Sequence, residues 1–182
     1  NPAGNVHGGT MLKMVENAGF VVATRLCNCW SGQPNHRPVL GQLAQIYEMD
    51  FWQPMYVGEL AKLYAKPTFT SGRSVEVLVD VWAENVVTGT VRKTNSAIVS
   101  YAASDPETGE APDWAIPQLS PETEEELRLF DDGFERYKTR KAMQTAKRSA
   151  VQHETDGAPA VDDCPTDSRV NLVQVMLPGD CS

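Results

Sequence analysis

The sequence predicts an α+β domain in which an antiparallel β-sheet wraps around one long central helix, with a second helix after the sheet. Residues 10–27 carry apolar side chains at helical spacing and on nearly every side, which is typical of a helix enclosed by the rest of a fold. Four β-like stretches with short connections follow this segment. With 182 residues, 41% of them hydrophobic, the chain is long enough for one substantial core.

The first helix is predicted from Thr10 to about Cys27. Its main apolar stripe consists of Met11, Met14, Val15, Ala18, Val22 and Leu26. Gly19, Phe20 and Val21 add small or apolar residues on the other sides, so we expect this helix to be central rather than peripheral.

Four strands are predicted, at residues 39–51, 57–70, 73–84 and 90–103. Gly72 and Gly89 stand where hairpin turns require a positive φ, so we expect successive strands to pair antiparallel. In the third strand four valines alternate with other residues, and this valine face suits packing against the helix. A helix wrapped by such a meander is the shape of a hotdog fold. Its exposed edge strand is commonly covered when two copies pair.

After the sheet the sequence predicts one helix and a tail. Ser120 is the expected N-cap, with Pro121 and several carboxylates in the first turn. A stripe of apolar residues on this helix predicts contact with the domain surface or a neighbouring subunit, and consists of Leu127, Phe130, Phe134 and Tyr137. From about Thr145 the chain is polar and contains Pro and Gly, so we expect a mostly disordered tail.

These elements divide the chain into a hotdog domain at 1–115, a C-terminal helix at 116–144 and a tail at 145–182. The chain starts at Asn1 rather than at a methionine, and a motif follows within a few residues. We therefore expect the first strand of the domain to be missing from this sequence.

Charge and composition exclude several classes of function. The net charge is −8, but residues 1–104 carry eight Lys and Arg against seven Asp and Glu, whereas residues 105–182 carry eight against seventeen. The overall charge argues against nucleic acid as a partner, and the near-neutral first part can accept a polyanionic small ligand. No apolar run approaches the ~20 residues of a membrane span, and no signal peptide is visible, so we expect a cytoplasmic protein.

The chain contains four cysteines, which we expect to be structural thiols. Cys27 and Cys29 resemble half of a metal site, but no second Cys or His pair stands at a suitable spacing. We therefore predict that the protein holds no metal.

The segment from Asn5 to Glu16 carries the candidate chemistry. Gly8 and Gly9 open the helix, whose N-terminus offers free N–H groups, and the missing Cβ atoms let a carbonyl come close. Such a place suits an oxygen on which negative charge develops. Glu16 lies two turns further, in an apolar stretch where a desolvated carboxylate is a stronger base toward water. Asn5 can orient that water or hydrogen-bond a carbonyl.

Simpler interpretations of the same residues stay open. Glu16 can pair with Lys13 at i, i+3, Asn5 can be a turn residue, and the two glycines can be a tight helix entry. His7 is expected to be structural, because no Ser, Cys or Asp stands at a telling spacing from it.

Four motifs, in order, closely resemble the cytosolic acyl-CoA thioester hydrolases of the hotdog superfamily. They are Asn5-Val6-His7-Gly8-Gly9-Thr10 through Glu16-Asn17-Ala18-Gly19, Asp50-Phe51-Trp52-Gln53-Pro54-Met55 with Val57-Gly58-Glu59, Thr68-Phe69-Thr70-Ser71 with Ser74-Val75-Glu76-Val77, and Pro117-Gln118-Leu119 with Pro121-Glu122-Thr123-Glu124 and Arg136-Tyr137. The resemblance covers about residues 5–141. It implies a thioesterase for medium- to long-chain acyl-CoA that uses no cofactor apart from the CoA of its substrate, and that self-associates as a dimer or a trimer of dimers.

The resemblance also implies a site shared between two hotdog units, one giving the Asn before His-Gly-Gly and the other giving the helix carboxylate. Asn5 and Glu16 match these positions, with Gly9 at the helix start. Two features depart from the family: its vertebrate members carry two hotdog units in one chain, and its active carboxylate is usually Asp. The alternative function is therefore a non-catalytic acyl-CoA-binding or scaffold subunit that needs an Asp-bearing partner.

In related hotdog enzymes CoA lies along one strand and the helix start, which correspond here to the turn at 70–74 and to Gly8. Thr70, Ser71 and Ser74 offer hydroxyl groups, and Arg73 offers a planar guanidinium that suits phosphate. The alternative is an ordinary hairpin turn with a solvated Arg73.

Overall fold

A computed structural model of the chain describes residues 4–29 and 37–155. The elements are α1 Gly8–Cys27, β1 Leu40–Phe51, β2 Leu60–Thr70, β3 Ser74–Glu84, β4 Val91–Ser104 and α2 Glu124–Thr155. The first helix and all four strands therefore lie within three residues of their predicted ends. The described residues fall into two units, which meet between Phe134 and Glu135 in the sequence.

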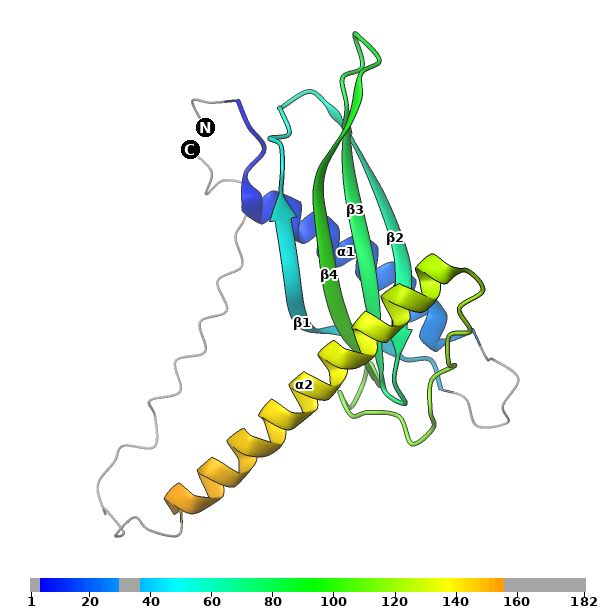
Figure 1. Cartoon of the computed structure of the whole chain (residues 1–182), viewed down its shortest axis with the longest axis vertical. Helices are drawn as coiled ribbons and strands as arrows, with labels where there is room; N and C mark the ends of the chain where they lie inside the picture. The colour runs from blue at the N-terminus through cyan, green and yellow to red at the C-terminus, as the bar shows by residue number, and fades with distance from the viewer. Residues whose placement is uncertain (1–3, 30–36, 156–182) are drawn as a thin grey trace. The chain divides into compact units, whose positions relative to one another are not determined.

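The four strands form one antiparallel sheet in the order β1-β4-β3-β2, with α1 behind it (Figure 1). Strands β2, β3 and β4 form a meander, as predicted. Strand β1 pairs with β4 and not with the next strand β2, so the prediction that all successive strands pair is wrong for β1. The sheet edges in the described part of the chain are thus β1 and β2. The side chains of β1 are mostly exposed on both faces.

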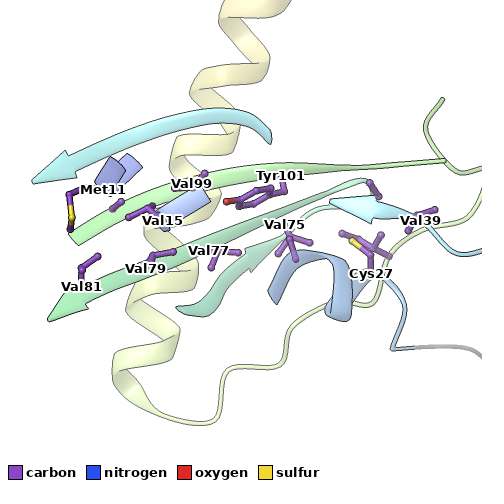
Figure 2. Packing of buried hydrophobic residues seen from close by; sticks show 14 of the residues in the cluster. Met11, Val15, Cys27, Val39, Val75, Val77, Val79, Val81, Val99 and Tyr101 are labelled. Atoms are coloured by element: carbon purple, nitrogen blue, oxygen red, sulfur yellow. The ribbon is translucent and has the colours of Figure 1, made fainter. Parts of the chain in front are cut away.

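The core lies between α1 and the inner face of the sheet. The buried side of α1 is a narrow stripe of every fourth residue, namely Met11, Val15, Gly19, Ala23 and Cys27. The alternating valines of β3, which are Val75, Val77, Val79 and Val81, are fully buried beneath it (Figure 2). The valine face of the third strand is confirmed as the face toward the helix.

The prediction that α1 is enclosed on nearly every side is wrong for the chain by itself. Leu12, Phe20 and Val21 are 36%, 37% and 50% exposed. A sheet of four strands covers one side of the helix, so the residues between the buried positions of the stripe face away from it.

The two predicted hairpin glycines behave differently. Gly89 has φ 72°, as its turn requires, whereas Gly72 is not among the positive-φ glycines. The turn between β2 and β3 is instead closed by Ser71, whose backbone N–H donates to the Ser74 carbonyl at 2.8 Å and whose Oγ accepts from the Ser74 N–H at 3.1 Å. A serine side chain that bridges the turn removes the need for a left-handed residue.

The second helix begins later and ends later than predicted. Its N-cap is Thr123 and not Ser120: the Thr123 hydroxyl accepts from the Glu126 N–H at 3.2 Å, and the Glu126 carboxylate accepts from the Thr123 N–H at 3.1 Å. This reciprocal capping box satisfies the first turn. The helix continues to Thr155, past the predicted start of the tail at about Thr145, because after Gly133 the sequence has no Pro or Gly until Gly157. Residues 156–182 lie outside the described part.

The start of α2 packs on the outer face of the sheet. The ring centroids of Phe130 and Phe134 lie 5.1 and 6.0 Å from that of Phe69 on β2. Gly133 allows this approach, because a Cβ there would lie 2.5 Å from the Phe69 Cβ and 3.0 Å from Glu76 Oε1. The predicted contact of this apolar stripe with the domain surface is confirmed for Phe130 and Phe134, whereas Leu127 is half-exposed.

Candidate functional site

His7 caps the N-terminus of α1. Its Nδ1 accepts from the Gly9 N–H at 3.2 Å, and its carbonyl accepts from the N–H groups of Thr10 and Met11 at 2.9 and 3.2 Å. The structural role expected for His7 is therefore observed. The cap also uses the Gly9 N–H, so a carbonyl that bound there would compete with the imidazole.

The chain itself does not require glycine at positions 8 and 9. Neither has a positive φ, and a Cβ at Gly8 would meet only Phe51 Cε1, at 4.0 Å. A Cβ at Gly9 would meet only the His7 ring, at 3.4 Å. The missing side chains leave the helix start open toward the outside, where a substrate or a second chain can approach.

Asn5 lies in a short antiparallel pairing just before α1. It forms an antiparallel bridge with Tyr56. Two backbone hydrogen bonds flank this bridge: the Val6 N–H donates to the Met55 carbonyl at 2.8 Å, and the Val57 N–H donates to the Gly4 carbonyl at 2.9 Å. The side-chain Oδ1 of Asn5 is buried. Asn5 is thus held by the loop between β1 and β2 and is not merely a turn residue.

Glu16 lies on the side of α1 that faces away from the sheet and is exposed. The expectation of a carboxylate desolvated within its own domain is therefore wrong: the buried positions are Val15 and Gly19, and each helical residue turns the side chain by about 100°. Among the described side chains, no ion pair joins Glu16 to Lys13, so that simpler interpretation is not observed either. Any desolvation of Glu16 requires something outside the described part of this chain.

The turn of α1 that carries Glu16 is anchored to the sheet by Tyr101 of β4. The Tyr101 hydroxyl donates to the backbone carbonyl of Glu16 at 2.8 Å. Burial raises the pKa of Tyr101, and the nearby Glu16 carboxylate raises it further, so this hydroxyl stays protonated and remains a donor. Sequence reasoning missed Tyr101, although it shares the inner face of β4 with Val99 and Ala103 at period two.

The predicted phosphate-binding turn uses most of its hydroxyls internally. Thr70 is buried and its Oγ1 accepts from the Leu119 N–H at 3.0 Å, while the hydroxyls of Ser71 and Ser74 lie 2.7 Å apart. Arg73 is exposed. Of the residues predicted for this turn, Arg73 is the one that extends into solvent.

The chain does not bring this turn and the start of α1 together. Ser74 pairs with Ala102 near the end of the sheet where β1 begins, whereas Phe51, at the other end of β1, lies beside Gly8. A 20-residue helix separates the two ends by about 30 Å. Gly8 and Arg73 of one chain therefore lie near opposite ends of the domain.

The described part of the chain has neither a metal-binding cluster nor a membrane-spanning helix. No group of three or more His, Cys, Asp or Glu side chains is arranged to hold a metal ion among residues 4–29 and 37–155. Neither described helix has the length and apolar character needed to cross a membrane.

Comparison with known proteins gives consistent matches. A family model described as the thioesterase superfamily matches residues 3–90. The human cytosolic acyl coenzyme A thioester hydrolase is 35% identical over 186 residues, which cover all of this chain and 46% of that protein, and its rat counterpart is 48% identical over 101 residues, 56% of this chain and 26% of that protein. The chain thus spans about half or less of the length of these relatives.

Solved structures agree with these matches. The crystal structure of an apo-hexameric acyl-CoA thioesterase superposes with a TM-score of 0.65 at 29% identity, covering 79% of this chain and 84% of that one. An acyl-CoA hydrolase from Bacillus cereus has the same TM-score at 20% identity, covering 84% of this chain and 85% of that one, and at that identity it shows the fold alone.

Proposed function

We propose that this chain hydrolyses fatty acyl-CoA thioesters to free fatty acid and CoA, because residues 3–90 match the thioesterase superfamily model and the chain shares the hotdog fold of acyl-CoA thioesterases. The family match carries this proposal, since residues 3–90 include Asn5, the open glycines and Glu16. Relatives named as cytosolic acyl-CoA thioester hydrolases support the same substrate class and a cytosolic location.

The proposed mechanism uses water activated by Glu16. The Glu16 carboxylate takes a proton from water while the water oxygen bonds to the thioester carbonyl carbon. The start of α1 at Gly9 stabilises the resulting oxyanion. The intermediate then collapses, the C–S bond breaks, and the proton passes from Glu16 to the CoA sulfur. Asn5 orients the water or the carbonyl. In this scheme no metal or redox cofactor takes part.

A site shared between chains fits the geometry of the single chain. Glu16 is exposed beside Leu12 and Phe20, so a second hotdog unit that covered this face would desolvate the carboxylate. Arg73 lies far from Gly8 of its own chain and would bind CoA phosphate next to the helix start of another. We therefore propose a dimer or a trimer of dimers, in line with the hexameric thioesterase that superposes on this chain.

The test is an assay of the purified chain with palmitoyl-CoA, measuring free thiol and the mass of the active species. Asn5→Ala and Glu16→Ala chains should each keep only a small residual kcat, and mixing them should restore part of the activity, since a mixed pair rebuilds one intact site. A fully active monomer, or no recovery after confirmed subunit exchange, would exclude the shared site.

The same assay distinguishes the enzyme from the alternative function. Tight CoA binding by the assembled wild-type chain without thiol release would identify a non-catalytic acyl-CoA-binding subunit. This alternative is considered because position 16 carries Glu, whereas the resemblance leads us to expect Asp. In that case, adding an Asp-bearing hotdog partner should restore turnover.

A further inference from the structure

The loop between β1 and β2 is braced by Arg92, the second residue of β4. Arg92 binds the Glu59 carboxylate through two parallel hydrogen bonds, Nη1 to Oε1 and Nη2 to Oε2, each of 2.7 Å. Its Nη2 also donates to the Pro54 carbonyl at 2.8 Å. Such a two-pronged contact fixes orientation as well as distance, which a single lysine ammonium does not do.

Glu59 passes this restraint on to the middle of the loop. Its Oε2 accepts from the Tyr56 N–H at 2.8 Å, and the Arg92 guanidinium lies 5.4 Å from the centre of the Tyr56 ring. The side chains of Glu59 and Arg92 are 8% and 22% exposed, so the pair is well shielded. The hydrogen bonds from Arg92 and from the Tyr56 backbone hold the pKa of Glu59 below its usual value.

The other side of the same loop holds the segment that contains Asn5. Met55 and Val57, on either side of Tyr56, make the two backbone hydrogen bonds to Val6 and Gly4 described above. Tyr56 is the bridge partner of Asn5. The Met55 side chain is buried in the core and fixes the loop from below. Two residues after Asn5, His7 caps α1.

We propose that Arg92 and Glu59 are positioning residues that hold Asn5 in register with the start of α1. The contacts form one continuous path from Arg92 through Glu59 and Tyr56 to Asn5. This role deepens the proposed thioesterase function and rests on it, because Asn5 is the group whose position the brace sets. Neither residue touches the reacting atoms.

Two ion pairs of the neighbouring strand β2 do not have this arrangement. Lys62 pairs with Glu84 on neighbouring strands and Lys66 pairs with Glu125 of α2. Neither pair contacts the residues from Pro54 to Glu59. Lys62 therefore offers a matched control, since Lys62→Met removes an ion pair from the adjacent part of the sheet and leaves the loop bonds in place.

The kinetic test compares Arg92→Lys and Glu59→Gln with Lys62→Met on palmitoyl-CoA. Both brace variants should lower kcat about tenfold or more with a smaller change in KM, because misplacement of a catalytic group by about 1 Å can cost up to roughly 10²-fold. The control should keep the wild-type kcat. Glu59→Gln preserves side-chain volume, so it serves if Arg92→Lys folds poorly.

The deciding measurement repeats these variants in an Asn5→Ala background. If the brace acts through Asn5, Arg92→Lys and Glu59→Gln should lower the residual kcat no further, whereas a general structural role would lower it by the same factor as before. The second result would overturn the proposal.

Hydrogen–deuterium exchange tests the brace independently of activity. The amides of Val6 and Val57 should exchange faster in both brace variants than in wild type and Lys62→Met, and equal exchange would overturn the proposal. A wild-type chain without thioesterase activity would refute the proposed function alone, since the exchange rates would still show whether the brace holds the Asn5 segment.

Discussion

The side chain of Tyr101 fills the space in which a Cβ of Gly19 would lie. A Cβ built at Gly19 would stand 2.8 Å from the ring atoms Cε2 and Cζ, and closer still to the hydroxyl. Because Tyr101 is almost fully buried, its ring has little room to move. Glycine at this position is therefore a packing requirement of the helix–sheet contact.

Gly19→Ala should lower the free energy of unfolding by about 1–3 kcal/mol, the usual cost of inserting a methyl group into a packed core. The better helix propensity of alanine, worth about 1 kcal/mol, offsets part of this loss. Denaturant unfolding at fixed protein concentration measures the difference. Gly72→Ala is the control, because a Cβ there meets nothing within 4 Å and its φ is not positive. Equal stability of Gly19→Ala and wild type would contradict the packing argument.

Glu16→Gln should lower kcat by roughly 10²- to 10⁴-fold while CoA affinity stays similar, because the amide cannot accept the proton from water. Since Glu16 is exposed in the single chain, the fold should be unaffected by this change. Steady-state kinetics and calorimetric titration with CoA separate the two effects. Normal turnover of Glu16→Gln would mean that the base lies elsewhere.

Glu16→Asp asks how far the site has adapted to the longer side chain. The substitution withdraws the carboxylate by one methylene and restores the acid that the family usually carries. Retained or increased kcat would show that the position is catalytic and tolerates either acid. A loss as large as that of Glu16→Gln would show that the site depends on the reach of glutamate.

Arg73→Ala should raise KM for acyl-CoA with little change in kcat, which is the pattern for the loss of a contact made equally in the ground and transition states. Added salt should weaken substrate binding more in wild type than in the variant, because one charge pair is missing from the variant. Arg128→Ala, an exposed arginine of α2, is the matched control. Equal salt sensitivity of all three proteins would make Arg73 an ordinary turn residue.

The brace between Arg92 and Glu59 should make stability depend on acid pH. The pKa of Glu59 in the folded protein lies below its ordinary value of 4.5, so its stabilising effect is fully present above about pH 4.5 and is lost as the pH falls through the folded value. The difference in Tm between wild type and Glu59→Gln should therefore be constant near neutral pH and shrink below about pH 4.5. Melting curves across this range test it, and a difference that persisted at the lowest pH would exclude the charge as its cause.

Local patterns in the sequence predicted the elements well and their surroundings poorly. The alternating valines of β3 and the helical spacing of Met11 and Val15 identified the buried faces, because period two and period 3.6 each place one side of an element in the core. The same patterns do not say how far the sheet reaches around the helix. The exposure of Glu16 and Phe20 was therefore missed.

The site shows the same division between local and long-range information. The non-catalytic character of His7 and the glycines that open the helix were visible in a few consecutive residues, whereas the N-cap role of His7 was not predicted. The pairing of Arg92 with Glu59 spans 33 positions, and that of Tyr101 with Glu16 spans 85, so no local spacing could indicate either. The cap at Thr123 could have been predicted, since Thr123 and Glu126 have the spacing of a capping box. The residue three positions after Ser120 is a threonine, which has no carboxylate to complete such a box.

The order of the strands has a consequence for folding during synthesis. During synthesis α1 leaves the ribosome well before the valines of β3 that cover its buried stripe. Strand β1 cannot pair until β4 has been synthesised, since Leu40 pairs with Ser104. Non-local pairings of this kind slow folding and leave apolar surface uncovered meanwhile. The apolar stripe from Met11 to Cys27 thus stays uncovered in the nascent chain until β3 has been synthesised.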